Sequence, residues 1–154
     1  MRFLLAAINI LLLSACLSQP DCLVTATNIV KISLKKANSD SVNTVNFAVI
    51  KVSGTDTLFY ENTSTSTLNL PVQPGVQETT FFFEYYTPVG GALVLKKDSV
   101  TLRYLPLYFV ISPDCGGYVY YNNLTVSSWS FANEPTVLNP QLLTSATTNL
   151  QIKL

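Results

Sequence analysis

Alternation of apolar and polar residues with a period of two runs through most of this chain and restricts it to β-strands. Val30, Ile32 and Leu34 alternate with lysine and serine, and the last residues of the chain repeat the pattern. Such alternation buries one face of a strand and exposes the other. After the first 15 residues, apolar residues nowhere recur at helical spacing. We therefore expect an all-β protein.

Proline- and glycine-containing turns divide this pattern into short strands. We expect turns at 53–56, 74–75, 88–91 and 96–98, and a loop with one helical turn over 133–146. The expected strands are 30–35, 45–52, 57–61, 68–70, 79–87, 92–95, 99–111, 118–121, 124–131 and 149–154. Many short strands in one domain predict an antiparallel β-sandwich of immunoglobulin-like type over 22–154, with a closed barrel as the alternative.

The N-terminus carries an export signal. One arginine precedes an apolar run, Phe3–Leu13, which is shorter than the roughly 20 residues of a spanning helix. Leu13-Ser14-Ala15-Cys16 then matches a bacterial lipobox. We predict a signal peptide over 1–15 and a lipid on Cys16. The alternative is a chance cysteine after an ordinary signal peptide, but ordinary cleavage favours a small residue where Leu13 stands.

The two other cysteines predict a disulfide. Once Cys16 carries lipid, Cys22 and Cys115 are the pair left, and exported proteins lie where disulfides persist. Cys115 follows Ser-Pro-Asp and precedes two glycines, which indicates a corner between strands. The alternative is a redox-active thiol, although the chain has no Cys-x-x-Cys pair. Residues 16–21 would form a tether of about 20 Å at most.

The amino-acid composition narrows the range of reactions and ligands that this chain can have. The 154 residues are 48% hydrophobic and 12% charged, with nine basic and nine acidic residues, so a core is expected and a nucleic-acid partner is not. The chain contains no histidine, which removes the usual general base and the commonest metal ligand. No motif for a metal, a phosphate or another cofactor is present. The carboxylates occur singly, so we predict no catalytic residues, while a hydrolase that joins two of them in the fold is a third hypothesis.

Aromatic residues supply a candidate binding surface. In the strand 79–87, Phe81, Phe83 and Tyr85 alternate with Phe82, Glu84 and Tyr86. The glutamate marks its own face as outward, so Phe82, Glu84 and Tyr86 form the predicted contact surface. The alternative is that these aromatic residues only serve strand packing.

Several segments together resemble an uncharacterised lipoprotein family of the Bacteroidetes. They are "PDC" (20–22), "VKISLKK" (30–36), "STLNLPV" (66–72), "DSVTLRY" (98–104), "VISPDCGG" (110–117) and "NLQIKL" (149–154). The resemblance implies a lipoprotein of the cell envelope and brings no activity or ligand. One departure is Asn149, where a histidine is expected to open the last strand.

Three short triplets also resemble the Asp-Ser/Thr-apolar acceptor for O-glycosylation of exported proteins in the Bacteroidetes. They predict modification at Ser41, Thr57 and Ser99. The alternative is chance, because the chain is rich in serine and threonine. Two Asn-x-Thr/Ser matches occur at Asn62 and Asn123, which a bacterial lipoprotein is not expected to use.

These features together predict a lipid-anchored protein of the cell envelope with a structural or protein-interaction role and no catalysis. The alternative is an accessory lipoprotein that binds a glycan or a peptide through its outward aromatic residues. The membrane, through the N-terminal lipid, and an envelope protein are the expected partners. Leu17, rather than aspartate, follows Cys16, and Asp21 is the one acidic residue of the tether, so we expect the outer membrane and its periplasmic face.

Overall fold

The computed structural model describes residues 24–113 and 115–154, and this part of the chain folds into nine strands without a helix. In chain order they are β1 (Ile29–Lys35), β2 (Val45–Val52), β3 (Leu58–Thr65), β4 (Thr67–Pro71), β5 (Glu78–Val89), β6 (Ala92–Ser112), β7 (Gly116–Trp129), β8 (Thr136–Val137) and β9 (Leu150–Lys153). The signal peptide, Cys16 and Cys22 lie outside the described residues.

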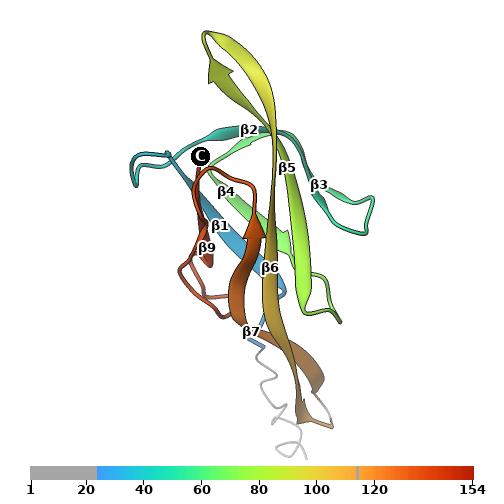
Figure 1. Cartoon of the computed structure of the whole chain (residues 1–154). Helices are drawn as coiled ribbons and strands as arrows, with labels where there is room; N and C mark the ends of the chain where they lie inside the picture. The colour runs from blue at the N-terminus through green and yellow to red at the C-terminus, as the bar shows by residue number, and fades with distance from the viewer. Residues whose placement is uncertain (1–23, 114) are drawn as a thin grey trace, which may run out of the picture.

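Two sheets pack face to face (Figure 1). One has the strand order β4-β1-β9-β8, and the other has the order β3-β2-β5-β6-β7. The described strands pair antiparallel, except that β1 and β9 pair in parallel. Parallel pairing is possible there because almost the whole domain connects the two strands. The predicted antiparallel β-sandwich is confirmed, with β1 and β9 as its one parallel pair among the described strands, and the immunoglobulin-like type stays a prediction.

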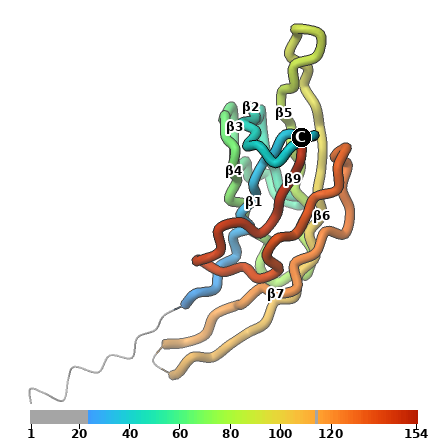
Figure 2. The backbone as a smooth tube through the Cα atoms, turned by 90° about the vertical axis from the view of Figure 1, so that its left-hand side faces the viewer, coloured from blue at the N-terminus to red at the C-terminus, as the bar shows by residue number. Residues whose placement is uncertain are grey.

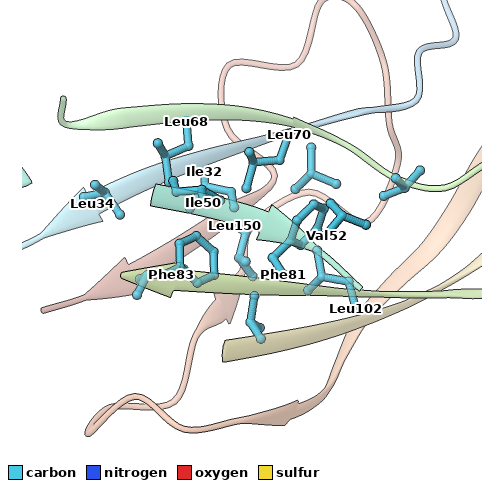
Figure 3. Close-up of a cluster of buried hydrophobic side chains, with 14 of the residues drawn as sticks. Ile32, Leu34, Ile50, Val52, Leu68, Leu70, Phe81, Phe83, Leu102 and Leu150 are labelled. Carbon is cyan, nitrogen blue, oxygen red and sulfur yellow. The ribbon is translucent and has the colours of Figure 1, made fainter. Parts of the chain in front are cut away.

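Alternating side chains from both sheets build the core (Figure 3). Ile32 and Leu34 of β1 point inward, as the sequence pattern predicts, and are 1% exposed. On the facing sheet, Phe81 and Phe83 of β5 are equally buried, and the Phe83 ring lies 5.5 Å from that of Phe131. The two sheets are therefore held together by the inward apolar side chains that the period-two pattern places on one face of each strand.

Two hairpins extend beyond the sandwich at opposite ends (Figures 1 and 2). The β5–β6 hairpin turns at Gly90 and Gly91, which both have positive φ. The β6–β7 hairpin turns between Ser112 and Gly116, where Cys115 lies, so the predicted corner at this cysteine is confirmed. A single strand, β6, thus runs from one end of the molecule to the other.

The segment that enters β1 lies at the end of the molecule with the β6–β7 hairpin (Figure 2). Ala26 forms an isolated bridge with Leu143, and the backbone N–H of Thr27 donates to the Leu142 carbonyl at 3.2 Å. The Leu142 N–H in turn donates to the carbonyl of Tyr121 in β7 at 3.0 Å. The start of the described chain is therefore fixed beside the base of that hairpin.

Three expectations about the boundaries of elements are wrong. The residues 96–98 form no turn, because β6 continues through them, with Lys97 opposite Glu84 of β5. The two strands expected over 118–131 are one strand, β7, in which Asn123 takes a positive φ. The loop 133–146 contains no helical turn among its described residues and instead contributes the short strand β8.

Candidate functional site: an outward ladder on the β5–β6 hairpin

One face of the β5–β6 hairpin carries a continuous row of outward side chains, which we call the outer ladder. Residues paired across two strands point to the same side of a sheet, and so do residues two positions apart. The outer ladder consists of the cross-strand pairs Phe82/Ser99, Glu84/Lys97, Tyr86/Leu95 and Pro88/Leu93. It begins on the sandwich and ends at the hairpin tip.

Large apolar side chains of the outer ladder face solvent. The exposed fraction is 46% for Phe82, 40% for Tyr86, 41% for Leu95 and 67% for Leu93. Their neighbours Phe81 and Phe83 are buried, so the alternation predicted from the sequence holds along β5. A row of exposed apolar side chains, unlike a single one, is typical of a surface that another molecule covers.

One ion pair lies within the outer ladder. The Lys97 Nζ atom donates to Glu84 Oε1 at 2.9 Å, across the two strands. The pair is solvent-exposed and contributes little to stability. The ion pair can instead set the orientation of a bound partner, because it places two fixed opposite charges between apolar side chains.

A shallow pocket of about 300 Å³ opens beside the first rung of the outer ladder. Phe82, Glu84 and Lys97 line it, together with Lys51 of β2 and Ser130. This volume is at the lower end of the range for small-molecule sites. The pocket is better suited to receive one side chain of a partner than to enclose a free ligand.

Behind the outer ladder, Asp98 is engaged in a structural network. The buried Tyr85 hydroxyl donates to Asp98 Oδ2 at 2.7 Å, and Ser130 Oγ donates to Oδ1 at 2.8 Å. Burial of the ring, then the hydrogen bond to Asp98 and its charge, raise the pKa of Tyr85 well above its ordinary value. Tyr85 therefore stays protonated and acts as a donor that holds β5, β6 and the residue after β7 together.

The other carboxylates with described partners are held separately. Glu78 accepts from Arg103 of β6 at 3.1 Å, and Asp40 accepts from Lys153, the last residue of β9, at 2.9 Å. The hydrogen bond from Lys153, and then its charge, hold the pKa of Asp40 below its usual value. Within the described residues, no group of three or more His, Cys, Asp or Glu could hold a metal ion.

The predicted modification sites differ in accessibility. Ser41 and Thr57 are exposed outside the long strands, where an enzyme could reach them. Ser99 is half-buried within β6, and its backbone N–H donates to Ser130 Oγ at 2.8 Å. Glycosylation at the three positions stays a prediction, and the geometry favours the first two.

Sequence reasoning missed the tip of the outer ladder. Ala92–Leu95 is an unbroken apolar run, and such a run usually indicates a strand that is buried on both faces. The structure instead exposes Leu93, Val94 and Leu95. A clue in the sequence is that this run directly follows the turn at Gly90 and Gly91, because residues next to a hairpin turn can project beyond the core.

The class of protein defined here is a two-sheet β-sandwich with an apolar ladder along one projecting hairpin. Residues 41–153 match a family of unknown function (DUF6452), and the chain belongs to this family. No curated protein and no solved structure matches the chain. Among the residues that the structure describes, no helix is long and apolar enough to cross a membrane.

Proposed function

We propose that this chain is a lipid-anchored protein of the bacterial cell envelope that binds another envelope protein through the outer ladder and catalyses no reaction. The observation that carries the proposal is the row of exposed apolar side chains, Phe82, Tyr86, Leu95 and Leu93, along one face. Aromatic side chains are enriched in the centres of protein interfaces, where they supply much of the binding energy.

The anchoring part of the proposal rests on Cys16 and the lipobox before it. Two or three acyl chains give stable membrane attachment, where one chain would not. The resemblance to Bacteroidetes lipoproteins supports this part, and the residues after Cys16 favour the periplasmic face of the outer membrane. A Cys22–Cys115 disulfide belongs to the same proposal, since it would join the tether to the domain.

Anchoring raises the effective concentration of any partner in the same membrane. A protein confined to a leaflet meets its neighbours far more often than a free one does. A contact of modest area can then be sufficient without a deep pocket. The outer ladder, with a few apolar side chains and one ion pair, fits such a contact.

Labelling tests the anchor. Cells grown with a fatty-acid analogue are expected to label the wild-type protein and not the Cys16→Ser variant, because the thiol is the atom that accepts the diacylglycerol. The readout is label on the purified protein after electrophoresis. Equal labelling of the two proteins would refute the anchoring at Cys16.

Photo-crosslinking in living cells tests the contact surface. A photoreactive residue at Leu95 is expected to give one discrete adduct with an envelope protein. Phe82→Ser should weaken that adduct by about tenfold, since loss of one apolar anchor costs on the order of 1–2 kcal/mol of binding.

The matched control places the same photoreactive residue at Asn69, which is exposed on β4 in the other sheet. It should give no discrete adduct. Equal amounts of adduct from both positions would contradict a specific partner site on the outer ladder. So would a Leu95 adduct that is as abundant in the Phe82→Ser variant as without that change.

A second candidate function is glycan or peptide binding, and the exposure of Phe82 and Tyr86 on one face favours it. Aromatic rings on a flat surface can stack on sugar rings. The crosslinking experiment separates a protein partner from a glycan, because a glycan ligand would give no protein adduct, and the mass of the adduct separates an envelope protein from a short peptide.

A further inference from the structure

The second projecting hairpin is apolar on both faces. We call it the lower arm and define it as Leu105–Ser112 of β6 with Gly116–Tyr120 of β7. Near its tip, Tyr108 is 73% exposed and Val110 is 83% exposed. On the other face, Phe109 stacks on Tyr118 with ring centroids 5.7 Å apart.

The lower arm carries no charged side chain among its residues. Between Arg103 and Glu134, the sequence contains one ionisable acid or base of the Asp, Glu, Lys or Arg type, Asp114, which lies outside the described residues. The β5–β6 hairpin differs, because it presents Lys96 and Lys97 as well as Glu84. The two ends of the molecule are therefore built for different surroundings.

Exposing the apolar side chains of a two-stranded arm to water is unfavourable in free energy. A lone two-stranded hairpin is at best marginally stable, and exposed apolar rows promote association. The backbone of the lower arm is nevertheless closely packed, since a Cβ on Gly117 would lie 2.8 Å from the Phe109 carbonyl oxygen. The lower arm is thus a defined element on which large apolar side chains are left exposed by the described part of the chain.

The position of the lower arm indicates what covers it. The described chain begins with Val24 at this end of the molecule, beside the base of the lower arm (Figure 2). Eight residue steps separate Val24 from Cys16, and an extended chain of that length spans at most about 27 Å. A lipid on Cys16 therefore keeps this end of the domain close to the bilayer.

The proposed disulfide would shorten that distance further. Cys115 lies at the tip of the lower arm, between β6 and β7. A bond from Cys22 to Cys115 would leave six residue steps, or about 20 Å at most, between the lipid-bearing residue and the tip. Both connections point the same end of the domain toward the membrane.

We infer that the tip of the lower arm rests in the interfacial layer of the phospholipid bilayer to which the chain is anchored. This inference rests on the proposed anchoring at Cys16. Tyrosines such as Tyr108 and Tyr118 suit this layer, because their rings are apolar and their hydroxyls reach water and headgroups. Interfacial elements of this kind bury their apolar face by roughly 5–10 Å.

Contact at the lower arm would also orient the rest of the domain. Leu93 and Val110 lie on the same strand, 17 residue steps apart, which corresponds to at most about 56 Å at the rise of a β-strand. With the lower arm on the bilayer, the outer ladder would point away from it. The anchor and the lower arm together would hold the partner surface at a set height.

Depth-dependent fluorescence quenching tests the inference on the full lipidated chain. The protein, with its native Trp129 changed to Phe, is reconstituted into vesicles of phosphatidylethanolamine and phosphatidylglycerol that contain phosphatidylcholine brominated at shallow or deep positions of its acyl chains. Val110→Trp places the reporter on the lower arm, and Leu93→Trp places it on the opposite tip as the matched control. Both sites are highly exposed, so both variants are expected to fold.

Val110→Trp should lose emission with the shallow bromines, lose less with the deep ones, and shift its emission to the blue. Leu93→Trp should show neither effect. An unquenched Val110→Trp, or equal quenching at both tips, would overturn the placement of the lower arm, including the case in which a protein rather than lipid covers it.

The intact mass of the same preparation separates this result from the anchoring. A chain that carries the lipid mass but shows no quenching at position 110 overturns the placement of the lower arm alone. A chain that lacks the lipid mass overturns the anchoring and, with it, the placement that depends on it.

Discussion

Phe83→Ala is expected to lower the free energy of unfolding by about 3–5 kcal/mol, the range for a large buried aromatic side chain cut back to a methyl group. The Phe83 side chain is 1% exposed, and its ring lies 6.3 Å from that of Phe47 and 5.5 Å from that of Phe131. These neighbours come from β2 and from the segment after β7, so a cavity here loosens three parts of the domain. Urea unfolding followed by circular dichroism would measure the loss.

The adjacent residue provides the matched control. Phe82→Ala removes the same atoms from the same strand, but its side chain is 46% exposed on the opposite face. We expect it to change the free energy of unfolding by less than about 1 kcal/mol. Similar losses for the two variants would contradict the assignment of faces on β5, and with it the outer ladder.

The period-two pattern was sufficient to predict the faces of the strands. In β1, Ile32 and Leu34 alternate with lysine and serine and are buried, and in β5 the charged Glu84 marks the outward face, opposite to the buried Phe81 and Phe83. This works because one face of each sheet must enter the core, and a slip by one residue would expose every one of these side chains. The all-β class and the sandwich follow from the same constraint.

Boundaries and pairings were less predictable. Lys96, Lys97 and Asp98 are typical turn residues, yet they lie within β6 because Lys97 pairs with Glu84 and Asp98 accepts from Tyr85. Both partners are in β5, more than ten residues away, so a local pattern cannot contain them. The parallel pairing of β1 with β9 is nonlocal in the same way.

The candidate site was predicted in part. The alternation on β5 places Phe82, Glu84 and Tyr86 outward, and the structure exposes the two aromatic residues. The continuation to Leu93 and the whole lower arm were not predicted, because an unbroken apolar run has the same appearance whether it is buried or projects from the domain. For Leu93, the turn at Gly90 and Gly91 just before the run is a local clue, but how far the paired strands project is visible only in three dimensions.

Asn149 is the position where the chain departs from the resemblance, and the structure gives it a specific role. Its side chain is fully buried. The Oδ1 atom accepts from the Lys31 N–H at 3.0 Å, and Nδ2 donates to the carbonyls of Asn139 and Gln141 at 3.2 and 2.8 Å. The amide thus joins β1 to the loop that precedes β9, and a neutral histidine, with one donor and one acceptor nitrogen, could supply part of the same set.

Asn149→Leu is therefore expected to lower the free energy of unfolding by about 3 kcal/mol or more, since it leaves one N–H and two carbonyls without their partner and each costs roughly 1–3 kcal/mol when buried. The control, Asn69→Leu, makes the same chemical change at an exposed position of β4 and should stay within about 0.5 kcal/mol of the wild type. Urea unfolding again gives both values, and hydrogen exchange should show faster exchange of the Lys31 amide in the first variant only. A loss below about 1 kcal/mol for Asn149→Leu would mean that these backbone groups find other partners, and that the amide at the start of the last strand does not hold the loop to β1.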